Sequence, residues 1–299
     1  MKRLIVIVGP TAIGKTVAAI KVAKALNTEI LSCDSRQFYK ELDIGVARPT
    51  PNELLAAKHH FIACRSITEP YNAFDYEHDA LAVLNKIFST NDNAVAVGGS
   101  GLYVDALCQG INFLPDPTPE LRAELSRKIA EGHLPELLNE LKQLDPYYYS
   151  IVDRQNPMRI QRALETIYTS GRPYSELVGK ELPQRPFEIV KFGLCCERDE
   201  LRERIYNRVD KMLDEGLIDE VRSLLPYRSL NTLNTVGYKE IFDYLDGKTT
   251  ITQAATFIKN HTWQYAKKQL TWLKRYNEII WVDRKKTENI LQVLCKKSY

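Results

Sequence analysis

No uninterrupted apolar run in the sequence approaches the ~20 residues of a membrane-spanning helix. Met1-Lys2-Arg3 leads directly into an apolar stretch, so we expect no signal peptide, no membrane partner and a cytoplasmic location. The 6 cysteines show neither CxxC nor Cys/His ligand spacing, which argues against structural zinc and against disulfides. A net charge of only +3 is too small to indicate a nucleic-acid partner by itself. The 44% hydrophobic content is enough for a globular core.

The most informative segment fits the pattern GxxxxGK[ST] and directly follows the apolar run Leu4–Val8; it reads Gly9-Pro10-Thr11-Ala12-Ile13-Gly14-Lys15-Thr16. The glycines allow successive N–H groups to point into one concavity, Lys15 adds a positive charge, and Thr16 can ligate Mg²⁺. The helix that follows presents the positive end of its dipole. The segment therefore predicts a P-loop that binds a ligand carrying a di- or triphosphate, with Mg²⁺ as the cofactor.

Strands and helices alternate along the first part of the chain. A helix is expected over residues 15–26, a strand over 29–33 ending at Asp34, a helix near 74–88 and a buried strand over 94–97. This order predicts an α/β fold with a P-loop NTPase-like parallel sheet, whose site lies at the carboxyl ends of the strands.

The alternation stops at the proline-rich segment 114–119, and residues 119–185 show helical periodicity without a good strand. Residues 188–196 are expected to return to the sheet, 199–225 and 252–276 to be helical, and 279–282 to form a last short strand. We therefore divide the chain into a P-loop α/β core, residues 1–118 and 186–299, and a helical insertion domain, residues 119–185.

An acidic residue is missing where P-loop ATPases and GTPases carry one at the end of a buried strand. Here the strand over 94–97 runs into Gly98-Gly99-Ser100-Gly101. This counts against a motor or a switch that activates water. Asp34 is the carboxylate expected nearest the P-loop, although a lone Asp after a strand is more often a cap or turn residue.

The C-terminal part of the chain is basic. Residues 259–286 contain 8 Lys or Arg against 2 acids, and on a helix Lys267, Lys268, Lys274 and Arg275 would share one face beside an apolar stripe. Such a ridge is often only solvated surface, so its charge alone favours that interpretation over nucleic-acid binding.

Together these segments resemble the tRNA dimethylallyltransferases, also called tRNA isopentenyltransferases, over nearly the whole chain. Several motifs in one order carry the resemblance and are more specific than the P-loop alone: Gly9–Thr16, Asp34–Gln37 with Tyr39 and Leu42–Gly45, His59-His60 with Glu69–Tyr71, Gly98–Tyr103, Asn156–Arg159 with Arg162–Glu165, Gly216–Val221, Val236–Glu240 and Tyr265–Trp272. The resemblance implies transfer of a dimethylallyl group from its diphosphate to N6 of the adenosine 3′-adjacent to a tRNA anticodon.

The resemblance also implies roles for residues. Asp34 would be the general base at N6, while Thr11, Lys15 and Thr16 would hold the diphosphate leaving group and its Mg²⁺. The target base must leave its stack to be reached. The helical insertion would contact tRNA, and the expected partners are tRNA and dimethylallyl diphosphate, with the chain acting as a monomer. The residues expected to contact tRNA are Asp34, Ser35, Arg36, Gln37, Ser100, Met158, Arg159, Ile160, Gln161, Arg162, Lys267 and Lys268.

The sequence departs from the family pattern at a few positions. Ile13 replaces the usual Ser of the P-loop and Ser100 the usual Thr, which are mild changes. Trp263 stands where the family usually has an Arg that contributes to diphosphate binding. We therefore expect diphosphate affinity to depend on a substitute, with Lys267, Lys268 or Arg208 as the candidates.

Three other functions remain open at the level of the sequence. A small-molecule P-loop kinase would use residues 119–185 as a lid, but it gives Asp34–Gln37 no role. An adenylate dimethylallyltransferase acting on free AMP or ATP would need neither the helical insertion nor the basic C-terminal helix. An RNA-binding protein with a decayed nucleotide site is supported only by Trp263.

Overall fold

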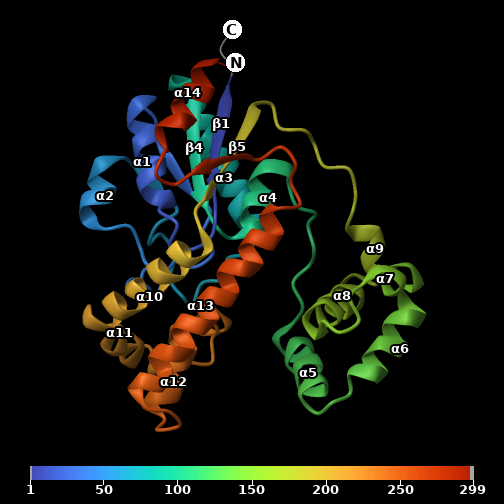
Figure 1. Ribbon diagram of the computed structural model, residues 1–299. Coiled ribbons are helices and arrows are strands. Elements are labelled where there is room, and N and C mark those ends of the chain that lie inside the picture. The colour runs from blue at the N-terminus through green and yellow to red at the C-terminus, as the bar shows by residue number, and fades with distance from the viewer. Residues whose placement is uncertain (1, 297–299) are drawn as a thin grey trace. The chain divides into compact units, whose positions relative to one another are not determined.

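The computed structural model describes residues 2–296, which form two compact units. Unit 1 comprises the chain up to Cys108 and from Arg185 onward, and unit 2 comprises Gln109–Gln184. Figure 1 shows the sheet and its helices in unit 1 and the small helical unit 2. The insertion expected from the sequence, residues 119–185, differs from unit 2 at both ends. Residues 109–118 group with the helices that follow them, and Arg185 belongs to unit 1.

Unit 1 is built on a parallel sheet of six strands in the order β3-β2-β4-β1-β5-β6, which confirms the predicted α/β fold. β1 is central and pairs with β4 on one side and β5 on the other, so that its last residue Val8 lies level with Gly98 and Gly193. The strands are β1 Arg3–Val8, β2 Ile30–Ser32, β3 His59–His60, β4 Asn93–Gly98, β5 Glu188–Cys195 and β6 Ile280–Asp283.

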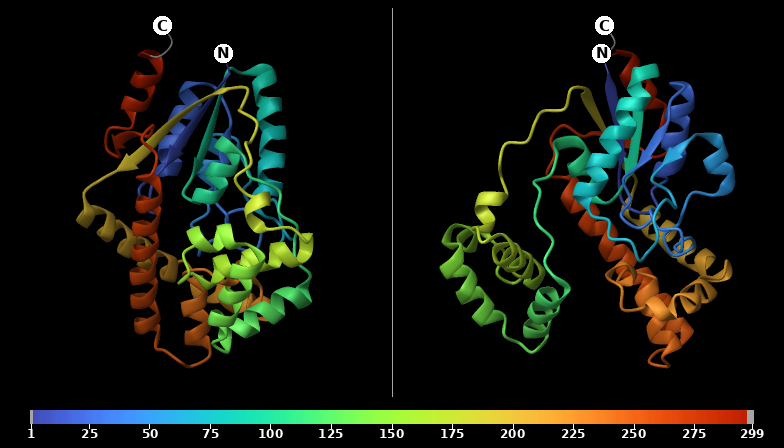
Figure 2. Two further views of the ribbon diagram at one scale, coloured as in Figure 1. Left: turned by 90° about the vertical axis from the view of Figure 1, so that its right-hand side faces the viewer. Right: turned by 180° about the vertical axis from the view of Figure 1, so that it is seen from behind.

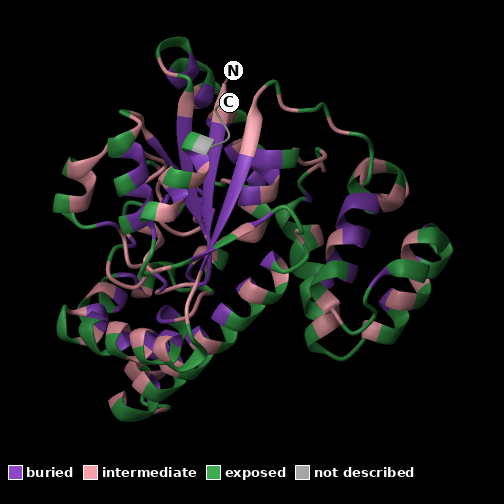
Figure 3. Cartoon of the chain, turned by 45° about the horizontal axis from the view of Figure 1, so that its top comes forward, coloured by how far each residue is buried: buried purple, intermediate pink, exposed green. Residues whose placement is uncertain are grey.

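Helices cover both faces of this sheet, which explains why β1 is apolar without alternation. Leu4 and Val6 pack with α3 (Ala73–Thr90) and α4 (Gly101–Gln109). Ile5 and Ile7 pack on the opposite face with α1 (Lys15–Ala25) and α14 (Glu288–Lys296). The strands are accordingly mostly buried in Figure 3.

The remaining helices of unit 1 are α2 Pro51–Ala56, α10 Arg198–Asp214, α11 Leu217–Ser223, α12 Tyr238–Leu245 and α13 Ile251–Leu273, the longest of them (Figure 2). The prediction of a single helical element over residues 199–225 is wrong in one respect. Gly216 has φ of 101°, a left-handed conformation that ends α10 and turns the chain into α11. Because of this turn, α11 runs in a different direction from α10 (Figure 1).

Unit 2 contains helices only, as the periodicity of residues 119–185 predicts. They are α5 Pro119–Ala130, α6 Leu134–Leu144, α7 Pro146–Ile151, α8 Pro157–Ser170 and α9 Tyr174–Leu177. Leucines at helical spacing, such as Leu125, Leu137 and Leu141, form its core with the inner face of α8. Asp145, only 2% exposed, accepts hydrogen bonds from the N–H groups of Tyr148 and Ser175 and so joins α7 to α9.

Over residues 2–296, no helix combines the length and the apolar character that a bilayer crossing requires.

Candidate active site

The P-loop Gly9–Thr16 connects the central strand β1 to α1. Ala12 (φ 64°) and Gly14 (φ 101°) adopt left-handed conformations, which turn the chain sharply before the helix begins at Lys15. The first N–H groups of a helix lack partners within it, so the start of α1 provides donors for an anion. The Ile13 side chain is fully buried against the sheet, and replacing the usual Ser with Ile therefore adds bulk to the core rather than to the site.

Two arginines from distant parts of the chain hold the P-loop through its carbonyl groups. Arg204 Nε on α10 donates to the carbonyl of Ala12 at 2.8 Å. Arg284 Nε, just after β6, donates to the carbonyl of Ile13 at 3.1 Å. Sequence reasoning missed both residues, because their contacts depend on how α10 and β6 pack beside β1.

Gln269 on α13 connects the P-loop to the segment after β4. Its Oε1 accepts from the N–H of Thr11 at 2.8 Å, and its Nε2 donates to the carbonyl of Gly99 at 2.9 Å. The hydroxyl of Tyr265, one turn earlier, interacts with both Ser100 and Gln269. The family string around residues 265–272 therefore places two side chains that fix the relative position of these loops.

Lys15 and Arg208 place positive charge at the P-loop. Lys15 Nζ donates to the carbonyl of Pro10 at 2.8 Å, and an Arg208 NH2 group donates to Thr11 Oγ1 at 2.6 Å. Burial lowers the pKa of Lys15 to about 8, an effect that nearby Asp34 opposes and Arg208 reinforces. Burial also lowers the pKa of Arg208 to about 10. Arg208 Nε is buried, and no hydrogen-bond partner for it exists among residues 2–296, so this cationic site has capacity for an anion.

Asp34 lies just beyond the end of β2, at the same edge of the sheet as the P-loop. Its Oδ1 accepts from the N–H groups of Arg36 at 2.9 Å and Gln37 at 3.4 Å, while no hydrogen bond from the described part of the chain reaches Oδ2. Ser35 N–H donates to Ser100 Oγ at 3.0 Å, which joins the segments after β2 and β4. The parallel strand ends therefore bring these polar residues together, as predicted.

A cavity of about 760 Å³ in unit 1 combines the P-loop, Asp34 and α10 in one site. Its lining continues along the segment between β2 and α2. The residues singled out from the sequence that line it are Thr11, Ala12, Gly14, Lys15, Thr16, Asp34, Gln37 and Arg208.

The cavity has a side-chain oxygen suited to ligate Mg²⁺ beside a bound phosphate. Thr16, the residue expected to ligate the ion, lines the cavity together with Asp34. Within residues 2–296, no three His, Cys, Asp or Glu side chains gather as a metal cage. Mg²⁺ does not require one, because it commonly keeps waters and takes one or two protein oxygens plus substrate phosphates. The Thr16 hydroxyl beside the P-loop fits such an ion.

The basic ridge and Trp263 lie outside this cavity. Lys267 and Lys268 are exposed on α13, and neither is part of the cavity lining. Trp263 is half-buried against the apolar cluster under α1, with the Arg198 guanidinium 5.8 Å from its ring, and it does not line the cavity either. Of the candidates to replace the missing family Arg, only Arg208 lies at the cavity.

The residues of α8 expected to contact tRNA divide into two groups. Met158 and Arg159 are exposed, and Arg162 is half-buried. Ile160 and Gln161 are buried in the core of unit 2, where Gln161 Nε2 donates to Glu165 Oε1 at 2.9 Å. The side chains of Ile160 and Gln161 therefore stabilise the helix packing and are not presented on the surface of this unit.

Known proteins similar to this chain agree over almost its full length. The family model described as IPP transferase matches residues 37–276. tRNA dimethylallyltransferase 1 of Bacteroides thetaiotaomicron is 45% identical over 98% of this chain and 96% of that protein. The tRNA dimethylallyltransferase of Christiangramia forsetii is 46% identical over 94% of this chain and 93% of its own length.

Solved structures show the same likeness. The tRNA isopentenylpyrophosphate transferase of Bacillus halodurans has 34% identity and a TM-score of 0.74, covering 99% of this chain and 97% of that one. A eukaryotic dimethylallyltransferase, in a structure described as acting on tRNA, has 25% identity and a TM-score of 0.76, covering 95% of this chain and 74% of its own. Sequence and fold thus agree, and the chain belongs to the IPP transferase family, the tRNA dimethylallyltransferases.

Proposed function

We propose that this chain transfers a dimethylallyl group from dimethylallyl diphosphate to N6 of the adenosine 3′-adjacent to the anticodon of a tRNA. One observation carries the proposal beyond family membership. A single cavity has a cationic P-loop and a carboxylate, Asp34, on its walls. Transfer to an amine needs both elements, a site for a departing diphosphate and an acceptor for the proton of the amine.

In the proposed reaction N6 attacks the first carbon of the allyl group. The bond between that carbon and oxygen breaks, and the diphosphate leaves with the electron pair. The proton of N6 passes to Asp34, whose Oδ2 is the oxygen not used by the N–H groups of Arg36 and Gln37. Lys15, Arg208 and the donors at the start of α1 stabilise the negative charge that develops on the leaving group.

Thr16 is the residue we propose to hold Mg²⁺, and the ion would neutralise charge on the diphosphate. Thr11 binds the diphosphate with the Gly9–Thr16 backbone, and Arg208 takes the place of the Arg that the family usually carries at position 263. Arg208 suits this role because its guanidinium already donates to Thr11 Oγ1.

We assign tRNA contact to Asp34–Gln37 after β2 and Ser100 after β4, to Lys267 and Lys268 on α13, and to Met158, Arg159 and Arg162 on α8. Exposed Lys and Arg side chains suit the phosphate backbone of an RNA. We further propose that the protein acts in the cytoplasm, where tRNA is used, and as a monomer.

The deciding experiment offers several acceptors to the purified protein. Labelled dimethylallyl diphosphate and Mg²⁺ are incubated with unmodified tRNA, with AMP, or with ATP, and the labelled product is digested to nucleosides. We expect label only on tRNA, as N6-dimethylallyladenosine 3′ to the anticodon. Label on AMP or ATP but not on tRNA would overturn the proposal in favour of an adenylate transferase. Phosphorylation of a metabolite by ATP without prenyl transfer would favour the kinase.

A further inference from the structure

A loop of residues 43–48, here called the 43–48 loop, forms part of the cavity wall. It lies between β2 and α2 and has no regular secondary structure of its own. The members that line the cavity are Asp43, Ile44, Val46, Ala47 and Arg48. Backbone hydrogen bonds from the N–H of Ala47 to the Ile44 carbonyl and from the N–H of Arg48 to the Asp43 carbonyl turn the loop on itself. Its attachment to the rest of the molecule depends on side chains.

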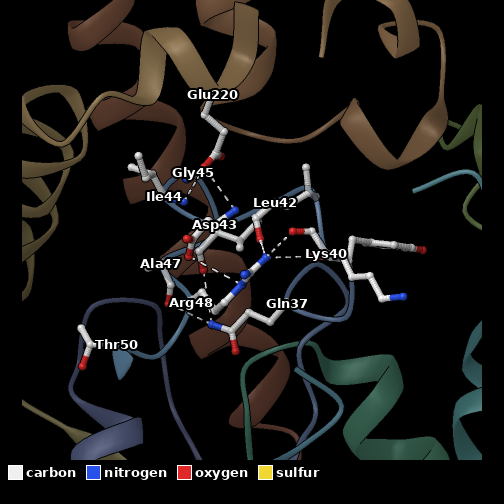
Figure 4. A network of polar contacts seen from close by, with 12 residues as sticks. Gln37, Lys40, Leu42, Asp43, Ile44, Gly45, Ala47, Arg48, Thr50 and Glu220 are labelled. Carbon is white, nitrogen blue, oxygen red and sulfur yellow. Dashed lines mark hydrogen bonds and ion pairs between the residues drawn. The ribbon is translucent and has the colours of Figure 1, made fainter. Parts of the chain in front are cut away.

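Glu220 on α11 binds the first half of the 43–48 loop (Figure 4). Its Oε2 accepts from the N–H groups of Ile44 at 2.7 Å and Asp43 at 3.2 Å. Its Oε1 accepts from the N–H of Gly45 at 3.1 Å and from the hydroxyl of Tyr238 at 2.6 Å. Both oxygens of one carboxylate are therefore occupied by donors, three of which come from consecutive residues of the loop.

The second half of the 43–48 loop is held from the side of Asp34. Gln37 Nε2 donates to the carbonyls of Val46 at 3.3 Å and Ala47 at 3.0 Å, and the N–H of Gln37 donates to Asp34 Oδ1. The guanidinium of Arg48 reaches back to the preceding turn, where it donates to the carbonyls of Tyr39, Lys40 and Leu42. Glu220 is the contact that fixes this wall from α11, a different part of the chain.

We propose that Glu220 is a positioning residue for the prenyl donor, because it holds the 43–48 loop where that loop completes the donor cavity. The inference rests on the proposed function, since it assumes that the cavity binds dimethylallyl diphosphate. Glu220 itself does not line the cavity, so it acts on the donor only through the loop.

Replacing Glu220 by Gln tests the carboxylate with little change in shape. An amide has one oxygen acceptor and two donors, so Gln cannot accept from both sides as the carboxylate does. The N–H groups of the loop then lose part of a charge-assisted interaction. We expect the Michaelis constant for dimethylallyl diphosphate to rise about tenfold, with kcat changed by less than about threefold.

Gly45 provides a second, independent way to displace the same loop. A Cβ at this position would lie 2.6 Å from atoms of the Tyr238 ring, which is fully buried and cannot easily withdraw. Gly45→Ala leaves Glu220 intact yet forces the loop away from α12. We therefore expect it to raise the same Michaelis constant, again with little change in kcat.

Asp219→Asn is the matched control. Asp219 precedes Glu220 on α11, is exposed and pairs only locally with Arg222 among the described residues, so its neutralisation should leave donor binding unchanged. Steady-state kinetics with tRNA saturating, well below each variant's melting temperature, separate KM from kcat. If Glu220→Gln does not fold, Gly45→Ala decides.

A wild-type-like KM in the variants, or a loss of kcat at unchanged KM, would overturn the positioning role. Measuring the wild type in the same assay distinguishes an error in the role of Glu220 from an error in the proposed function. An inactive wild type contradicts the prenyl transfer, whereas an active wild type with unaffected variants contradicts only the role of Glu220.

Discussion

Binding of dimethylallyl diphosphate should be coupled to the titration of Lys15. Burial lowers the pKa of this ammonium group to about 8, and the nearby Asp34 carboxylate offsets this effect only in part. A diphosphate at the P-loop supplies further compensation and should return the pKa toward its ordinary value of about 10.5. Since the diphosphate favours the charged form of Lys15, the affinity for the donor is highest below pH 8 and declines as the pH rises through that value.

The magnitude follows from the charged fraction of Lys15. With a pKa of about 8, that fraction falls roughly tenfold between pH 7 and pH 9, so the dissociation constant of the donor should rise about tenfold. Binding should take up about 0.1 proton at pH 7 and about 0.8 proton at pH 8.5. Arg208, with a pKa of about 10, stays charged over most of this range.

Isothermal titration calorimetry measures both quantities. The donor is titrated without tRNA, so that no transfer occurs, at constant saturating Mg²⁺ and in buffers of different ionisation enthalpy. Lys15→Arg is the control, because a guanidinium remains charged at pH 9 and should flatten the profile even if its affinity is lower. Equal dissociation constants at pH 7 and 9, together with heats independent of the buffer, would refute the coupling.

Four further variants test the site and its support. Asp34→Asn should lower kcat about 10²–10⁴-fold, with little change in tRNA binding as measured by filter retention. A variant that turns over as fast as the wild type would show that Asp34 is not the base. Arg208→Met should raise the KM of the donor about 10–100-fold, whereas Trp263→Arg should leave it within about twofold, since Arg208 lines the cavity and Trp263 does not. The reverse order of effects would return the diphosphate contact to position 263. Gly98→Ala should lower the melting temperature by roughly 5–10 °C in calorimetry, because its Cβ would lie 2.4 Å from the carbonyl oxygen of Cys33. An unchanged melting temperature would show that β4 can shift to accommodate the methyl group.

Much of this site could be predicted from local patterns. The apolar run, the glycines and the lysine of the P-loop are contiguous, so the loop and its helix follow from the sequence alone. The proximity of Asp34 and Ser100 required one further step, the rule that parallel strands end at a common edge. Their connection through Ser35, with its N–H 3.0 Å from Ser100 Oγ, agrees with that expectation.

The supporting contacts could not be predicted in the same way. Glu220 and Arg204 are single polar residues on amphipathic helices, whereas Gln269 is a buried polar residue on the inner face of α13. Their partners are backbone groups far away in the chain, such as the N–H of Thr11, 258 positions from Gln269. The motifs Gly216–Val221 and Tyr265–Trp272 contain Glu220 and Gln269, but the contacts of these side chains follow only from the packing of α11 on the 43–48 loop and of α13 on the P-loop.

The glycine-rich segment at the end of β4 explains why the acidic group of this site follows β2 instead. A Cβ at Gly98 would lie 2.4 Å from the Cys33 carbonyl, and one at Gly99 would lie 2.4 Å from Gln269 Nε2. An Asp at either place would therefore displace the β2 end or the residue that holds Thr11. The close packing that excludes a carboxylate after β4 also brings Ser100 to the segment carrying Asp34. This arrangement places cations and a carboxylate beside the P-loop, which suits the proposed transfer from a donor with a diphosphate leaving group.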